Sequence, residues 1–229
     1  MHDGGEGDAL LAVVSAEART ALLATARTHE LAPGTVLFDV GHARDVFLVE
    51  RGVVRVGWPL SANRRALGAL FGAPTLLGSD VALAHQSCLY DVAAHTAVSV
   101  RVIDGGVFST WIETYPAAMT ALVGKSIAMQ RLLLLRHRKA HDELASRVAD
   151  LLLSYLVALG VTEDEPAWVA LTNEQISRDL GVVLRSISTA VSGLVRAGLV
   201  RRAPRGLVIL DRARLTVLAG SSGTFVPPP

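Results

Sequence analysis

The order of apolar and polar positions between residues 171 and 210 predicts two short helices followed by a hairpin. Thr172 and Gln175 have the spacing of a capping box, in which the two side chains satisfy the first backbone N–H groups of a helix. Gly181 then supplies a turn. In the second helix, apolar residues recur at i, i+3, i+4 and i+7 and therefore share one face. These residues are Ile187, Ala190, Val191 and Leu194.

The opposite face of the second helix carries arginines and short hydroxyl side chains. At about 100° per residue, this polar face holds Arg185, Thr189, Ser192 and Arg196. Arginine can pair bidentately with guanine in the major groove of DNA, so the pattern favours a helix-turn-helix whose second helix enters that groove. The alternative is an ordinary amphipathic helix with a solvated polar face.

A β-hairpin is expected directly after the second helix. Gly198 occupies the usual left-handed position past a helix end, and two strand-like segments, 199–202 and 207–210, flank a turn at 203–206. Residues 171–214 include eight arginines and three acidic residues, which gives this segment a net charge of +5, whereas the whole chain carries +1. The basic excess therefore concentrates where DNA would lie. A solvated basic hairpin is the alternative.

Short apolar runs broken by glycine dominate the chain from about residue 31 to 108. They lie at 34–38, 46–49, 52–56 and 98–103. Strands this short and regularly spaced predict a compact β-roll or barrel. Asp104-Gly105-Gly106 is expected to form a turn before the next segment.

A long helix is expected from about Tyr115 onward, because Pro116 suits a first helical turn. Its apolar residues form two stripes, one through Leu122, Met129, Leu132 and Leu133 and the other through Val123, Ile127 and Leu134. One stripe would be covered by the β-roll and the other by a second copy of the helix. We assign the first stripe, Leu122, Met129 and Leu132, to the dimer interface; an intramolecular bundle is the alternative.

Composition supports a two-domain protein. The chain has 229 residues, of which 51% are hydrophobic, yet it contains no run of about 18 apolar residues that would span a membrane. The start, MHDGGEGD, does not resemble a signal peptide, so a cytoplasmic location is expected. The expected segments are a β-roll with an N-terminal helix (1–112), a central helix (113–140), a DNA-binding domain (141–220) and a flexible tail (221–229).

Metal and cofactor chemistry finds little support in the sequence. Cys88 is the single cysteine, which excludes an intramolecular disulfide and a cysteine-based zinc or iron–sulfur site. His137 and His141 have i, i+4 spacing but lie among basic residues, which favours a solvated stretch. No P-loop, nucleophile elbow, zinc-protease motif or dinucleotide fingerprint is present. We therefore expect no metal, no cofactor and no enzymatic activity.

The order of these elements resembles the CRP/FNR superfamily of bacterial transcription regulators. Four segments carry the resemblance: PGTVLFDVG, DVFLVERGVVRV, DELASRVADLLLSYL and LTNEQISRDLGVVLRSISTAVSGLVRAGLV. The resemblance implies an α+β chain with an N-terminal β-roll of the cyclic-nucleotide-binding type, a long central dimerisation helix and a C-terminal winged helix-turn-helix. It also implies a homodimer on two-fold symmetric double-stranded DNA, with RNA polymerase as a candidate partner.

The effector pocket implied by the resemblance lacks its polar anchors. Family members that bind cyclic nucleotides use a Gly-Glu pair for the ribose and an arginine for the phosphate; here Gly78 precedes Ser79, and Cys88 aligns with the arginine. A phosphate buried without a cation is strongly disfavoured. We therefore predict that cyclic AMP and cyclic GMP do not bind, and that the protein acts without ligand or answers an apolar effector. The degenerate pocket comprises Gly78, Ser79, Cys88, Leu89, Leu132 and Leu133.

The helix expected to contact bases also departs from the family pattern. The family's Arg, Glu and second Arg correspond here to Leu184, Arg185 and Thr189, so a TGTGA-like half-site is not expected. Arg185 is the strongest candidate for reading guanine. The expected DNA contacts are Thr172, Arg185, Ser186, Ser188, Thr189, Ser192, Arg196, Arg201, Arg202 and Arg205.

The sequence thus predicts a homodimeric, sequence-specific transcription regulator. The alternative is a dimeric β-roll sensor or scaffold that acts through protein contacts. A DNA-binding regulator predicts a steep dependence of affinity on salt, and the scaffold predicts none.

Overall fold

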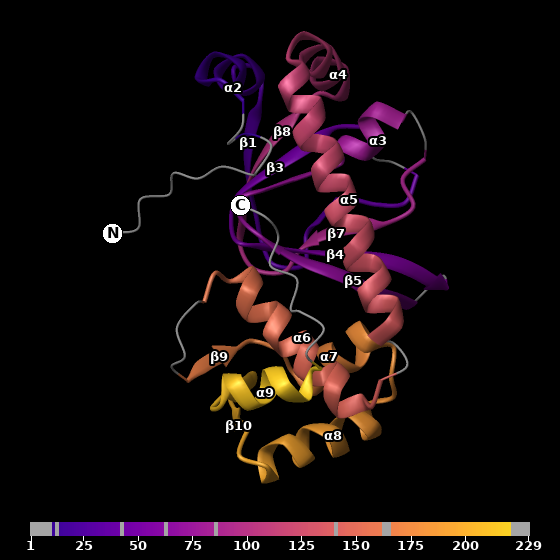
Figure 1. Cartoon of the computed structure of the whole chain (residues 1–229), viewed down its shortest axis with the longest axis vertical. Coiled ribbons are helices and arrows are strands. Elements are labelled where there is room, and N and C mark those ends of the chain that lie inside the picture. Colours follow the sequence, from indigo (N-terminus) through magenta and orange to yellow (C-terminus); the bar gives the residue numbers. More distant parts are fainter. Residues whose placement is uncertain are drawn as a thin grey trace. The chain divides into compact units, whose positions relative to one another are not determined.

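The computed structural model describes residues 11, 14–41, 44–61, 64–84, 87–139, 142–161 and 166–220 (Figure 1). By their contacts, the described residues divide into two compact units. Unit 1 contains residues up to 56 together with 71–131, and unit 2 contains residues 57–70 together with 132–220. The two units are described separately below.

Two four-stranded sheets form the N-terminal half of the chain, as the sequence predicts for a β-roll. In the first sheet the strand order is β1 (Arg27–Leu31), β8 (Val98–Ile103), β3 (Val46–Arg51) and β6 (Thr75–Leu77), and neighbouring strands are antiparallel. In the second sheet the order is β2 (Val36–Phe38), β7 (Asp91–Ala94), β4 (Val53–Ser61) and β5 (Arg64–Gly72). The α+β fold class is confirmed.

Four helices accompany these sheets: α2 (Ala16–Leu23), α3 (Ser79–Ala84), α4 (Gly105–Thr114) and α5 (Pro116–Lys139). Trp111 connects two of them, because its buried indole N–H donates a hydrogen bond of 2.7 Å to the carbonyl of Ala18. Its ring lies 5.8 Å from that of Phe108. Leu22, Ile103 and Phe108 belong to the same buried cluster, which joins α2 and α4 to the first sheet.

The expectation of a turn at residues 104–106 is wrong, because α4 begins there. Asp104 is the N-cap, and its carboxylate accepts hydrogen bonds from the backbone N–H groups of Gly106 at 2.9 Å and Val107 at 3.0 Å. Aspartate is among the favoured N-cap residues because it satisfies N–H groups that lack an intrahelical partner. The two glycines that suggested a turn lie instead in the first turn of a helix.

Unit 2 is built around α6 (Leu144–Ala158), which packs against α8 (Leu184–Arg196) and α9 (Arg212–Leu218). Between α6 and α8 lie β9 (Ala167–Val169) and α7 (Asn173–Leu180). The predicted hairpin is present as β10 (Val200–Ala203) and β11 (Gly206–Ile209), and β9 extends it to an antiparallel sheet of order β10-β11-β9. The sequence did not suggest β9, which has only three residues.

The close approach of β9 to the hairpin requires glycine at position 206. A Cβ atom added there would lie 2.2 Å from the carbonyl oxygen of Val169, within the backbone of the neighbouring strand. Gly193, on α8 in the same unit, has no such neighbour within 4 Å. The two glycines therefore provide a matched pair for testing the register of this sheet.

We expect Gly206→Ala to lower the free energy of unfolding by about 1–3 kcal/mol, because the methyl group forces β9 and β11 apart. Gly193→Ala should raise it by about 0.5–1 kcal/mol, because alanine loses less backbone entropy in a helix than glycine does. Urea denaturation followed by circular dichroism measures both. Equal stability of Gly206→Ala and the parent protein would contradict the observed pairing of Leu207 with Val169.

Candidate nucleic-acid interface

The predicted capping box is present at the start of α7. The Thr172 hydroxyl accepts a hydrogen bond from the Gln175 N–H at 3.3 Å, and the Gln175 side chain accepts one from the Thr172 N–H at 2.8 Å. Glu174 lies between them, and hydrogen bonds from its own backbone N–H and from the Thr172 hydroxyl lower the pKa of its carboxyl group. Thr172 therefore has a structural role whether or not it contacts DNA.

A left-handed residue closes α7 and starts the turn that leads into α8. Gly181 has φ +66°, a conformation that other residues adopt only with strain. The N–H of Val182 donates to the Ser177 carbonyl at 3.0 Å, and the Ser177 hydroxyl donates to the Val182 carbonyl at 2.6 Å. Both polar backbone groups of Val182 are thus bound to one residue of α7, which holds the turn in a single geometry.

Helix α8 has the two faces that the sequence predicts. Ile187, Val191 and Leu194 are buried, and Ala190 is half-buried beside them. On the outward face, Arg185, Thr189 and Arg196 are exposed. The arginine that the sequence selected for guanine readout is therefore available to a ligand.

The serines of α8 are less accessible than its arginines. Ser186, Ser188 and Ser192 are half-buried. The Ser188 hydroxyl accepts a hydrogen bond of 3.2 Å from the Asn173 side chain, and the Ser192 hydroxyl donates one of 2.7 Å to the Ser188 carbonyl. Asn173 was not predicted from the sequence, and it connects the first turn of α7 to the middle of α8.

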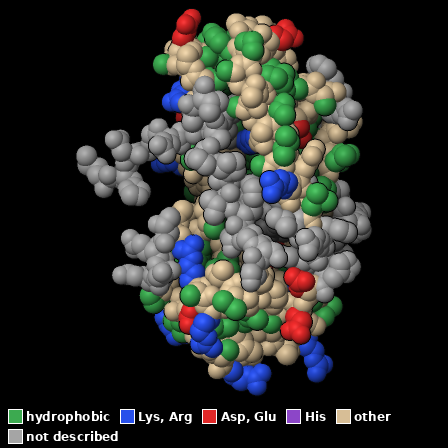
Figure 2. Space-filling model, in the orientation of Figure 1, with side chains coloured by type: hydrophobic (Ala, Val, Ile, Leu, Met, Phe, Trp, Pro, Cys, Tyr) green, Lys and Arg blue, Asp and Glu red, His purple; other side chains and the backbone are tan. Residues whose placement is uncertain are grey.

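The β10–β11 hairpin presents its arginines to solvent. Arg201, Arg202 and Arg205 are all exposed, and the guanidinium of Arg202 donates to the Ser192 hydroxyl at 2.9 Å. Arg205 lies in the tight turn between the strands with φ +58°, which is unusual for a residue with a side chain. Arginine side chains lie along the end of unit 2 that contains α8 (Figure 2).

Two exposed apolar residues at the start of α8 were not predicted as part of this surface. Val183 is 70% exposed and Leu184 is 41% exposed, and they directly precede Arg185. In the sequence analysis Leu184 counted only as a departure from a family pattern, and Val183 was not considered. Their exposure depends on the turn at Gly181, and no sequence signal for it was recognised.

The residues predicted to form a degenerate effector pocket do not share one environment. Gly78 has φ +82°, Ser79 and Cys88 are buried, and Leu89 is 72% exposed. The Cys88 thiol donates to the Tyr90 carbonyl at 3.0 Å, and burial raises the pKa of this thiol. Leu89 therefore points away from the interior. The side chains of Leu132 and Leu133 lie outside the described part of the structure.

Tyr90 connects this segment to α3. Its hydroxyl donates a hydrogen bond of 2.7 Å to the Asp80 carboxylate, and burial is the main cause of the raised pKa of this phenol. Its ring lies 5.6 Å from the ring of Phe38. The carboxylates of Asp80, Asp39 and Asp91 also act to raise the pKa of the Cys88 thiol, and negative charge around the position that aligns with a phosphate-binding arginine disfavours an anion.

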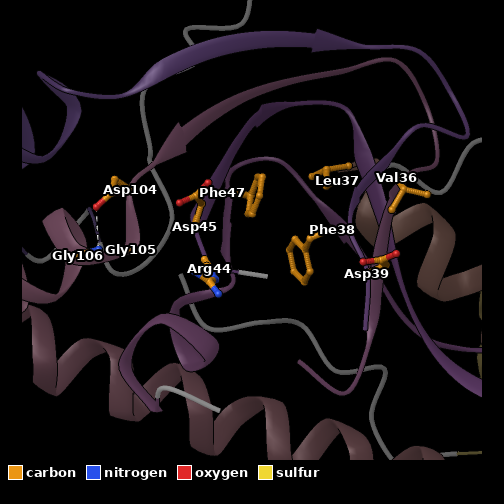
Figure 3. Close-up of a pocket in the computed structure, with 10 residues that line it drawn as sticks. All are labelled: Val36, Leu37, Phe38, Asp39, Arg44, Asp45, Phe47, Asp104, Gly105 and Gly106. Atoms are coloured by element: carbon orange, nitrogen blue, oxygen red, sulfur yellow. Dashed lines mark hydrogen bonds between the residues drawn. The ribbon is translucent and has the colours of Figure 1, made fainter. Parts of the chain in front are cut away.

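A separate open pocket of about 810 Å³ lies in unit 1. Figure 3 shows the rings of Phe38 and Phe47, whose centroids are 5.0 Å apart, in the middle of this pocket. Ser79 and Cys88 are not among its lining residues, so it does not coincide with the predicted effector pocket. It is lined by Val36, Leu37, Phe38, Asp39, Arg44, Asp45, Phe47, Asp104, Gly105 and Gly106.

The assignment of the two apolar stripes of α5 is corrected by the structure. Leu122, predicted to face a second subunit, is 6% exposed and belongs to the buried cluster of unit 1. The exposed residues are instead Met119, Val123, Ile127 and Leu134. The core of unit 1 covers the side of the helix that carries Leu122, so this residue is not available to a second subunit. The other predicted interface side chains, Met129 and Leu132, lie outside the described ones.

Neither a metal cluster nor a membrane helix is found in the described ranges. No group of three or more histidine, cysteine, aspartate or glutamate side chains there could hold a metal ion. No described helix is long and apolar enough to cross a membrane. The side chains of His137 and His141 lie outside the described part.

Comparison with known proteins agrees with these observations. Residues 146–218 match the Crp-like helix-turn-helix domain. No curated protein matches the chain significantly in sequence.

Solved structures show the same fold over most of the chain. FixK2 from Bradyrhizobium japonicum is 21% identical, with a TM-score of 0.72 over 87% of this chain and 100% of that protein. The c-di-GMP-responsive global regulator CLP from Xanthomonas campestris is 12% identical, with a TM-score of 0.73 over 86% and 100% of the two chains. A CRP-family transcriptional regulator from Thermus thermophilus is 22% identical, with a TM-score of 0.69 over 87% and 100%.

The likeness to these three structures therefore extends over the greater part of this chain and the whole of each matched chain. The chain carries a Crp-like helix-turn-helix domain and has the fold of the CRP/FNR transcription regulators.

Proposed function

We propose that this protein is a homodimeric transcription regulator that binds double-stranded DNA in a sequence-specific manner. The observation that carries the proposal is the outward face of α8, where Arg185 and Thr189 are exposed beside a hairpin with three exposed arginines. The buried face of the same helix is fully occupied by the core of unit 2. The outward face is therefore free to meet a ligand, and its charge suits a polyanion.

Two kinds of contact with DNA are proposed, one to base edges and one to backbone phosphates. Arg185 lies in the first turn of α8, the part of a recognition helix that meets base edges, and its fork of donors fits guanine. Arg201, Arg202 and Arg205 lie on the hairpin, where contacts to phosphates would set register and orientation. Arg202 is already directed toward α8 by its hydrogen bond to Ser192. Thr189, Ser192 and Arg196 continue the polar face along the helix.

Dimerisation would use the exposed stripe of α5. Met119, Val123 and Ile127 recur at i, i+4 and i+8 and leave apolar surface facing solvent in a single chain. A second copy of α5 would cover this surface along a two-fold axis. Two recognition helices about 34 Å apart would then enter successive major grooves of a symmetric site.

The residues at the positions of the family's nucleotide-binding groups support a regulator that cyclic AMP and cyclic GMP do not control. Cys88 replaces a cation and remains a protonated thiol, and Ser79 replaces a carboxylate. DNA binding without ligand, or control by an apolar effector, is consistent with this pocket. RNA polymerase remains the candidate partner at a promoter. A scaffold that acts through protein contacts is the competing function, and the salt dependence of DNA binding separates the two.

The first prediction concerns the two kinds of arginine. Arg185→Ala should weaken binding to a preferred duplex by about 1–3 kcal/mol and relax specificity at one base pair. Arg201→Ala should weaken binding to all duplexes similarly and reduce the slope of log K against log salt by about 1. Fluorescence anisotropy with a selected duplex and a scrambled duplex measures both effects.

Two results would contradict this assignment. If Arg185→Ala kept the affinity and selectivity of the parent protein, α8 would not be the recognition helix. If the parent protein bound neither duplex with a negative salt slope, the scaffold function would be favoured.

The second prediction concerns the dimer. Ile127→Glu should convert the dimer to a monomer at micromolar concentration, because it places a charge in the centre of the exposed stripe. Ala117→Glu is the matched control, since position 117 is also exposed and lies about 80–160° around the helix from the three stripe residues. Sedimentation velocity distinguishes the two variants, and a dimeric Ile127→Glu protein would place the interface elsewhere.

The third prediction concerns nucleotides. Isothermal titration calorimetry with cyclic AMP and cyclic GMP should show no binding in the micromolar range, because no cation compensates the buried phosphate. Saturable heat with a micromolar dissociation constant would show that another part of the chain supplies that charge.

A further inference from the structure

The start of α8 exposes an apolar pair in the middle of a polar surface. Val183 is 70% exposed and Leu184 is 41% exposed, and the exposed Arg185 follows them directly. Neither side chain contributes much to the core of unit 2, whose contacts from α8 come from Ile187, Val191 and Leu194. Their apolar surface would leave water only when a ligand covers this end of the helix.

The helix also begins in a way that does not favour its own stability. Val183 is the N-cap of α8 and makes no side-chain hydrogen bond to the helix. Four other helices of the chain begin at serine, threonine or aspartate residues whose side chains accept hydrogen bonds from the first turn: Ser15, Asp104, Thr172 and Asp211. Valine is among the least favourable N-caps. Glu143, the N-cap of α6, also makes no side-chain hydrogen bond to its helix, so the missing cap weakens the start of α8 and the exposure of Val183 and Leu184 is what sets this position apart.

The position of the pair indicates what would cover it. The turn at Gly181 places Val183 and Leu184 at the N-terminal end of α8, where recognition helices meet base edges in the major groove. Thymine is the standard DNA base with a methyl group in that groove, and apolar side chains contact this methyl group favourably. Arg185, one residue further on, supplies the polar contact that an apolar pair lacks.

We infer that Val183 and Leu184 recognise the C5-methyl groups of thymines next to the base pair that Arg185 contacts. The inference rests on the proposed function and adds a determinant of specificity to it. It predicts a half-site in which a guanine has thymine at a neighbouring step on one strand or the other. Each methyl group buried against the pair should increase affinity about fourfold, which is about 0.8 kcal/mol.

The experiment replaces thymine by deoxyuridine, which pairs identically but lacks the methyl group. A duplex is first selected by the full-length protein from a randomised pool, and a second version then carries deoxyuridine at every thymine of the half-sites. The parent protein should bind the deoxyuridine duplex about fourfold more weakly per contacted methyl group. The double variant Val183→Ser/Leu184→Ala should bind both duplexes equally.

Two control variants separate methyl recognition from effects on folding. Val217→Ala removes an exposed valine from α9 of the same unit, and it should keep the full preference for thymine. Val183→Ser alone supplies a good N-cap and should raise the midpoint of thermal unfolding. A more stable variant with a smaller preference for thymine is a combination that damage to the fold would not produce.

The outcomes are distinguishable from failure of the proposed function. Equal binding of both duplexes by the parent protein, with a steep salt slope and a selected consensus, would overturn methyl recognition and leave DNA binding intact. The same preference in the parent protein and the double variant would assign the methyl contact to other residues and overturn the inference. If no duplex were enriched and the salt slope were flat, both proposals would fail together.

Discussion

The left-handed turn at Gly181 is the constraint on which the interface of unit 2 depends. It ends α7, and Ser177 then binds both backbone polar groups of Val182, so that α8 begins within two residues. Once the start of α8 is fixed, Ile187 and Val191 are buried in the core. Arg185 and Thr189 then point outward, because they lie on the opposite face of the same rigid helix. A bulky residue at position 181 would strain the turn and shift every contact that follows.

The helix-turn-helix could be predicted from the sequence because its signals are local. The capping box at Thr172, the glycine at 181 and the apolar spacing of α8 each involve residues within one or two helical turns of each other. The hairpin was equally recognisable from its turn residues. Asp104 shows how such signals compete, since two glycines suggested a turn while the aspartate before them capped a helix. The three-residue strands β6 and β9 were not predicted, whereas β2, of the same length, was found within the longer apolar run at 34–38.

What the sequence did not predict depends on packing between distant segments. Both stripes on α5 are apolar, and only the core around Leu22 and Trp111 decides that Leu122 is covered and Ile127 is not. The exposure of Val183 and Leu184 likewise follows from the turn and from the buried face of α8. In the sequence analysis Leu184 was only a departure from a pattern and Val183 was not considered, whereas in the structure the two form an exposed apolar surface.

Arg205 imposes a different kind of constraint, on how this protein could change. Its left-handed backbone conformation costs about 1–3 kcal/mol in a residue with a side chain, and glycine or asparagine would adopt it more easily. Laboratory evolution for heat tolerance would therefore tend to discard this arginine, and each round of enrichment would remove a positive charge from the tip of the hairpin. If the hairpin contacts DNA as proposed, selection for stability and selection for DNA binding act on this one codon in opposite directions.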